Sequence, residues 1–246
     1  MVPAPTPAVN SALPGELCYN ALWKGEQRDM ADFRDILLIL IGVVLAIDVH
    51  ECAHAWSADK LGDPTARLLG RVTLNPVKHL DPLGTVMIVM SSLSGFGIGW
   101  GKPTPVNPYR LKYGPRTGMA LVSVAGPLSN LLTAFVLMLP YRIFGRAVPP
   151  ALLTILATWA FVNVILTVFN LIPLPPLDGF SVLMGILTSI RSPAVQRVTR
   201  ALSQIEAYGP MVLLAVLAVG WVTGRSLLGA IMGQPVDLLW KLIAGW

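Results

Sequence analysis

The stretch from Ile36 to Leu61 constrains the fold more than any other part of the chain, because it is apolar enough for a membrane and yet contains ionisable residues. About 20 mostly apolar helical residues span the roughly 30 Å hydrocarbon core of a bilayer. At about 1.5 Å per residue, His50 lies about 21 Å into this segment and is therefore still within the hydrocarbon. Ionisable side chains at that depth are costly, and they are functional candidates by default.

These ionisable residues form a His-Glu-x-x-His pattern made of His50, Glu51 and His54. On a helix the two histidines lie one turn apart on the same face, so both imidazoles can bind one metal ion. Glu51 projects about 100° away and is placed to act as a base rather than as a ligand. The simpler alternative is that the two histidines hydrogen-bond inside a helix bundle without a metal.

The composition places the chain among integral membrane proteins, with 54% hydrophobic and 13% charged residues. The net charge of +5 does not indicate a nucleic-acid partner, because the basic residues are dispersed between apolar stretches. The two cysteines, Cys18 and Cys52, do not suggest a disulfide framework. Cys52 lies about 160° around the helix from His54, which favours a packing role over a third ligand.

The apolar segments predict an α-helical integral membrane protein. Its core has three spans at about 36–56, 118–139 and 151–172, with a fourth span at about 208–224. Residues 1–30 are expected to be a disordered tail, or a misassigned start before Met30, and residues 31–246 a single membrane domain. The amphipathic run at 192–204, and the last segment with Trp240 and Trp246, are expected at the membrane interface.

Between the first two spans, the sequence predicts smaller elements. Residues 66–74 have the mixed, β-branched character of a short membrane-associated β segment. His79 is expected to form a structural hydrogen-bonding pair with a neighbouring aspartate rather than a metal site. Residues 83–100 are short and broken by glycines, which favours a re-entrant hairpin over a span. Residues 101–108 contain three prolines, so they form either an extended edge for a bound peptide or a surface loop.

The third span ends in a proline-rich run from Asn170 to Gly179 that contains Asp178. A catalytic zinc bound by two histidines needs a third protein ligand and an open position for water. Asp178 is the only acidic residue between Asp81 and Glu206, so it is the best carboxylate available. The alternative is a plain turn aspartate before glycine.

A re-entrant hairpin at 83–100 would place the end of the first span and Asp178 on the same side of the membrane. The basic residues at 60–78, 102–116 and 191–200 lie on that side, whereas the opposite side has only Lys24, Arg28, Arg34, Arg142, Arg146 and Arg225. Positive charge marks the cytoplasmic side. We therefore expect a site that is buried in the membrane, in the cell membrane of a prokaryote, and open towards the cytoplasm.

Taken together, the two motifs resemble the site-2 protease family of intramembrane zinc metalloproteases. Residues 50–54 match that family's first motif, 170–179 match its Asn-x-x-Pro-x-x-x-Leu-Asp-Gly motif, and 101–108 and 125–127 are similar to family segments. The resemblance covers about residues 36–185. It implies one Zn²⁺ bound by His50, His54 and Asp178, with Glu51 as the base and Asn170 steadying the transition state. It also suggests a short form without a PDZ or nucleotide-sensing domain.

The expected function is that of a zinc-dependent endopeptidase that cuts membrane proteins in or near their transmembrane segments. Its expected partners are a transmembrane protein substrate and the lipid bilayer, with no nucleic acid, and the oligomeric state is left open. A catalytically inactive relative or a metal-binding membrane transporter is the alternative, and Glu51 would be dispensable in either. No further acidic residues line a conduction path, which favours the enzyme. Asp48 matches no family position and has no assigned role.

Overall fold

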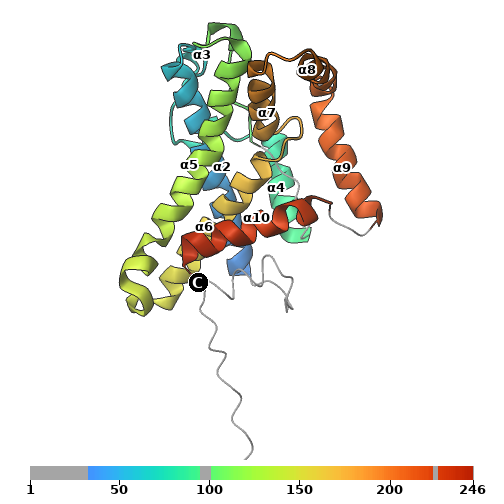
Figure 1. Cartoon of the computed structure of the whole chain (residues 1–246). Coiled ribbons are helices and arrows are strands. Elements are labelled where there is room, and N and C mark those ends of the chain that lie inside the picture. Colours follow the sequence, from blue (N-terminus) through green and yellow to red (C-terminus); the bar gives the residue numbers. More distant parts are fainter. Residues whose placement is uncertain (1–32, 95–100, 224–226, 246) are drawn as a thin grey trace, which may run out of the picture.

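The computed structural model describes residues 33–94, 101–223 and 227–245, so the predicted tail at 1–30 lies outside the described residues. The described chain is mainly helical (Figure 1). In chain order the helices are α2 (Phe33–Lys60), α3 (Thr65–Leu68), η2 (Pro76–Lys78), α4 (Pro82–Ser94), η3 (Pro108–Arg110), α5 (Pro115–Phe144), η4 (Gly145–Ala147), α6 (Pro150–Asn170), α7 (Asp178–Ser189), α8 (Pro193–Glu206), α9 (Gly209–Thr223) and α10 (Leu227–Ala244).

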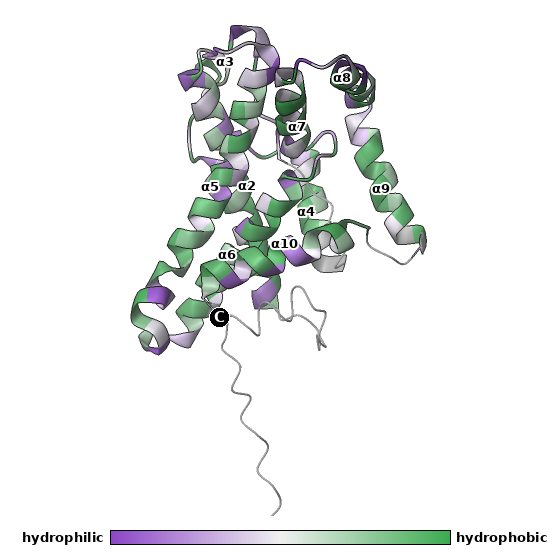
Figure 2. Ribbon diagram, viewed as in Figure 1, coloured by the Kyte–Doolittle hydropathy of each residue, from purple (hydrophilic) through white to green (hydrophobic). Residues whose placement is uncertain are grey.

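Helices α2, α5 and α6 contain the three predicted core spans, and each is long and apolar enough to cross a membrane. Figure 2 shows hydrophobic residues along most of α5, α6 and α9, whereas hydrophilic residues gather around α3 and α8. This distribution, with four helices long and apolar enough to cross a membrane, confirms a helical membrane protein. The α2 and α6 helices approach closely where Gly42 faces Trp159, and a Cβ on Gly42 would lie 2.7 Å from the indole ring.

The last helix, α10, differs from its prediction. It meets the length and hydropathy requirements of a span, and it packs across α5 and α6 (Figure 1). The interfacial position predicted for Trp240 is wrong, because this side chain is 2% exposed and its ring lies edge-on to Phe161 with 5.1 Å between the centroids. Arg142 donates a hydrogen bond to the Ile243 carbonyl and so ties the end of α10 to α5.

The predicted fourth span corresponds to α9, which has only 15 residues. It follows α8 after a bend of 81°, and only the two helices together pass the criteria for a broken span or a re-entrant loop. Helix α8 has no buried residues and is strongly amphipathic, as expected for a helix at the interface.

The β segment predicted at 66–74 does not form. Residues Thr65–Leu68 are helical, and the part of the chain that the structure describes contains only one isolated bridge, between Leu80 and Gly101. Local hydrogen bonds use the backbone groups that a strand would need, since the amide of Arg71 donates to the carbonyl of Ala66 at 2.9 Å. Without a partner strand, helical turns satisfy this backbone instead.

The same bridge shows where the two ends of the segment 83–100 lie. Leu80 and Gly101 lie side by side, and the amide of Lys102 donates to the carbonyl of His79 at 2.7 Å. The chain therefore leaves and returns at the same level. Helix α4 has 13 residues and is about 20 Å long, which is too short for the roughly 30 Å core. The described ends of the segment agree with the re-entrant prediction, and residues 95–100 lie outside the described part.

Candidate metal centre and catalytic site

Three predicted residues from two helices meet at one point. His50 and His54 lie one turn apart on α2, and Asp178 is the first residue of α7. Asp178 Oδ2 lies 3.0 Å from His50 Nε2 and 3.2 Å from His54 Nε2, and the two Nε2 atoms are 3.0 Å apart. Both histidines are buried. The cluster thus joins two residues of one sequence motif with a third residue more than a hundred positions away.

The outer nitrogen of each imidazole has an acceptor. His50 Nδ1 lies 2.6 Å from Asn130 Oδ1, and His54 Nδ1 lies 2.8 Å from the carbonyl of Val122. Each Nδ1 therefore carries a proton, and in the neutral rings each Nε2 presents a lone pair towards Asp178.

The cluster fits a zinc ion. In a tetrahedral site with bonds of about 2.0–2.1 Å, ligand atoms lie about 3.3 Å apart, close to the separations observed here. Asp178 Oδ2 is buried, and no partner donates a hydrogen bond to it among the described residues, although two nitrogens lie next to it. Three lone-pair atoms in contact without a shared proton repel one another unless a cation lies between them.

Asn130 fixes the orientation of His50, a role that the sequence did not reveal. Its amide nitrogen donates to the carbonyl of Ala46 at 3.0 Å and to Asn163 Oδ1 at 2.7 Å. Both amide protons are used there, so Oδ1 must face His50. Asn130 is fully buried, and Asn163 is held in turn by the carbonyl of Trp159. The segment that follows 125–127, which is similar to a family segment, thus also supplies this partner of the metal ligand.

Glu51 lies between the two histidines in sequence and points towards the segment after the hairpin. Its Oε2 accepts hydrogen bonds from the amide and the hydroxyl of Thr104, each at 2.8 Å. The predicted base is thus held by residues 101–108, for which the sequence left open either a peptide edge or a surface loop. The amide of Thr104 is already bonded to Glu51 and so is not free to pair with another strand.

The remaining sequence candidates lie elsewhere. The Asn170 amide donates to the Leu166 carbonyl one turn earlier at 3.0 Å, and its contribution to a transition state stays a prediction. Cys52 is free and does not belong to the metal cluster. His79 is fully buried and structural, as expected, but the nearby carboxylate is Asp48 at 3.6 Å rather than its sequence neighbour Asp81.

Asp63 ties the end of α2 to the segment before α5. Its carboxylate accepts hydrogen bonds from the Thr65 amide at 3.2 Å and the Asn107 amide at 2.6 Å, and it is fully buried. Burial alone raises the pKa of Asp63, but a hydrogen bond from the Thr65 hydroxyl, the two amide donors and the charge of Arg110 outweigh it and lower the pKa below 3.8.

We expect Asp63→Asn to destabilise the protein by about 2 kcal/mol at pH 7, because a charged acceptor is lost. A lowered folded-state pKa contributes stability above the unfolded pKa of 3.8, and this contribution is lost as the pH falls through the folded value. Thermal unfolding in detergent should therefore show a gap between wild type and variant at pH 7 that narrows as the pH falls below 3.8. The control is Asp59→Asn, which removes a surface ion pair with Arg67 and should change the stability little. A stability gap between wild type and Asp63→Asn that stays the same at low pH would contradict the lowered pKa of Asp63.

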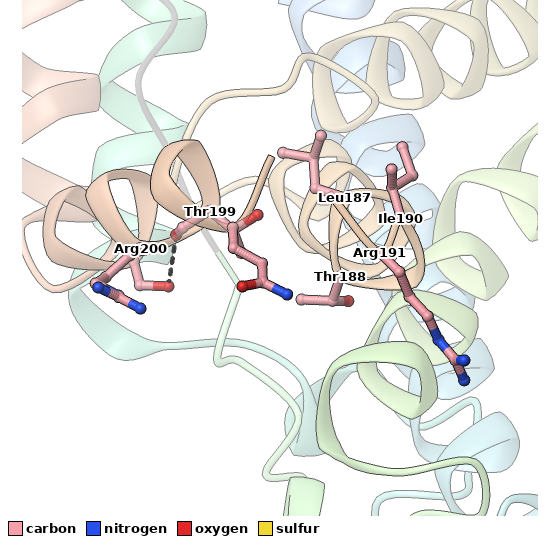
Figure 3. Close-up of a pocket in the computed structure, with 8 residues that line it drawn as sticks. Leu187, Thr188, Ile190, Arg191, Thr199 and Arg200 are labelled. Carbon is pink, nitrogen blue, oxygen red and sulfur yellow. Dashed lines mark hydrogen bonds between the residues drawn. The ribbon is translucent and has the colours of Figure 1, made fainter. Parts of the chain in front are cut away.

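A separate pocket of about 310 Å³ lies between the end of α7 and α8 (Figure 3). Arg191 and Arg200 line it, but their side chains extend in different directions, so they do not converge on one ligand. The pocket contains none of the cluster residues.

Comparisons with known proteins agree with this geometry. The model of peptidase family M50 matches residues 138–216, which include the motif around Asp178. The chain is 40% identical over 213 residues to the "Putative zinc metalloprotease YwhC" of Bacillus subtilis, covering 84% of this chain and 90% of that protein. It is 30% identical over 190 residues to the "Putative zinc metalloprotease Rip2" of Mycobacterium tuberculosis, covering 76% and 71% of the two chains. No solved structure matches.

The relative in Bacillus subtilis spans nearly the whole described chain, including both motifs that form the cluster. The two histidines and the aspartate that the fold brings together are the residues on which the family resemblance depended. The chain therefore belongs to peptidase family M50, the site-2 protease family.

Proposed function

We propose that this protein is a zinc-dependent endopeptidase that hydrolyses peptide bonds within or near the transmembrane segments of other membrane proteins. One observation carries the proposal: the lone pairs of His50, His54 and Asp178 converge at one point in a helical membrane protein, beside a glutamate. The names of the two relatives, each printed as a "Putative zinc metalloprotease", support it.

In this proposal His50, His54 and Asp178 hold Zn²⁺ and leave a fourth position for water or substrate. When bound, zinc supplies Lewis-acid activation of water and of the scissile carbonyl. Asn130 and the Val122 carbonyl keep both Nε2 atoms aimed at the ion by holding the opposite ring nitrogens.

Glu51 acts as the general base and then as the general acid. It accepts a proton from the attacking water at a carboxylate oxygen and later delivers it to the nitrogen of the leaving amine, so that the C–N bond breaks to give a neutral amine. Its position next to His50 in sequence keeps it close to the metal ligands without making it one.

The surroundings of the site support a membrane substrate. The ligands lie near the end of an apolar helix long enough to span a bilayer, so substrates reach them from the membrane. A transmembrane helix must unwind locally before cleavage, because its backbone is otherwise hydrogen-bonded internally. The basic residues at 60–78, 102–116 and 191–200 support an orientation with the site open to the cytoplasm of a prokaryotic cell.

The alternative is a metal-binding transporter or an inactive relative. It would use the same three ligands, but it would have no need for a carboxylate held in place beside them. The two hydrogen bonds to Glu51 Oε2 favour the enzyme.

The test uses the purified full chain in lipid nanodiscs with two probes. One is a dye–quencher peptide with a Leu/Ala transmembrane helix interrupted by Pro-Gly, and the other is fluorescein-labelled casein. We expect zinc-loaded protein to cleave the membrane peptide, a chelator to stop cleavage, and added Zn²⁺ to restore it. Cleavage of casein alone would contradict the membrane substrate class, and cleavage of neither probe would contradict the endopeptidase.

A further inference from the structure

We infer that Thr104 is a positioning residue for Glu51, an inference that rests on the proposed function. The amide and the hydroxyl of Thr104 both donate to Glu51 Oε2 at 2.8 Å. Among the described residues, no partner donates a hydrogen bond to the other carboxylate oxygen, Oε1. Thr104 therefore fixes one oxygen of the base and leaves the second to accept the proton of water.

The segment that carries Thr104 is attached to α2 on both sides of it. Before Thr104, the Lys102 amide donates to the His79 carbonyl at 2.7 Å, and His79 is buried against Asp48 of α2. After Thr104, the Asn107 amide donates to Asp63 just beyond α2 at 2.6 Å. The amide and hydroxyl of Thr104 are thus held at a fixed position along α2, the helix that carries Glu51.

The local sequence keeps this segment close and stiff. Pro103 and Pro105 flank Thr104, fix their own φ angles and restrict the residues before them to extended conformations. Gly101 lies directly on α2, since a Cβ there would be 2.7 Å from Ile47 Cγ2 and 3.2 Å from the His79 carbonyl oxygen. The donors are therefore ordered before substrate binds, which removes an entropic cost from the reaction.

This arrangement assigns Asp48 and His79 a role that the motifs do not. Asp48 Oδ1 lies 3.6 Å from His79 Nε2, which also contacts the Thr73 carbonyl at 2.9 Å. Together these contacts hold the loop that contains His79, and the His79 carbonyl in turn holds the Thr104 segment through the Lys102 amide. The two buried residues act on Glu51 through Thr104.

The experiment compares substitutions at position 104 in the zinc-loaded full chain, using the dye–quencher membrane peptide. Valine removes only the hydroxyl, proline removes the hydroxyl and the amide hydrogen, and serine keeps both donors. We expect Thr104→Val to lower kcat about fivefold with KM nearly unchanged, Thr104→Pro to lower kcat at least about tenfold further, and Thr104→Ser to stay within about twofold of wild type. Zinc content should be the same in the valine and serine variants.

The matched control is Thr133→Val, which removes a hydroxyl that donates only to the Ser129 carbonyl within α5. Its kcat should equal that of wild type. A Thr104→Val variant with wild-type kcat would overturn the positioning role while leaving the protease intact, provided that Glu51→Gln is inactive. An active Glu51→Gln variant would instead overturn the proposed function itself. If the proline variant does not fold, the contrast between valine and serine still decides.

Discussion

Glu51→Gln should abolish peptide cleavage while zinc stays bound. A primary amide has the shape of the carboxylate but does not accept a proton at neutral pH, so water loses its base and the amine its acid. General acid–base catalysis contributes about 10²- to 10⁴-fold, and we expect a loss in that range. The Gln oxygen can still accept the two hydrogen bonds from Thr104, so local structure should persist. Turnover of the membrane peptide measures the loss of cleavage. Atomic absorption measures whether zinc stays bound.

Glu206→Gln is the control for this change, because it makes the same substitution in a partly exposed ion pair with Arg116. Such surface pairs contribute about 0–1 kcal/mol, so activity should stay within about twofold of wild type. A Glu51→Gln variant that kept a tenth or more of wild-type activity would contradict the general-base role. With zinc still bound, that result would favour the binding or transport alternative.

The metal cluster could be predicted because two of its three members are fixed by helix geometry. His50 and His54 need only an α-helix over four residues to share a face, and an apolar segment of this length predicts that helix. Asp178 followed by elimination, since the chain has no other acidic residue between Asp81 and Glu206. The prediction also needed the two ends of the segment 83–100 to lie close together, and the bridge between Leu80 and Gly101 shows that they do.

The residues that orient the cluster were not predicted, since their partners are set by tertiary packing. Asn130 is 80 positions from His50, and Thr104 is 53 from Glu51. No periodicity relates such pairs. An amide in the middle of an apolar span is itself a signal, since a buried polar group at membrane depth needs a partner.

The errors in the predicted fold have a similar origin. Tryptophan near a chain end is typical of a membrane interface, but Trp240 fills a space beside Phe161 in the core formed with α6. Val72 and Thr73 gave residues 66–74 a β-branched character, yet a strand needs a partner and none lies beside it within the described residues. Local preference decided neither case, because burial and backbone pairing outweigh it.

A second large effect is expected at Gly126, which is not itself a metal ligand. A Cβ at this position would lie 2.5 Å from His54 Nε2 and 2.6 Å from His50 Cε1, far inside van der Waals contact. Gly126→Ala must therefore push both rings away from Asp178 or shift α5 away from α2. Ligands need to hold their geometry within about 0.5 Å, so we expect zinc affinity to fall about 100-fold or more. Competition with a fluorescent chelator measures this loss directly.

Gly233→Ala is the matched control, because Gly233 lies in a helix, α10, and a Cβ there would meet no atom within 4 Å. Replacing an unconstrained helical glycine by alanine stabilises a protein by up to about 1 kcal/mol. Gly233→Ala should therefore keep zinc affinity and raise the melting temperature slightly, whereas Gly126→Ala should lose zinc although its own helix propensity increases. Wild-type zinc affinity in Gly126→Ala would show that the metal does not lie between the two imidazoles, and the ligand assignment would fail with it.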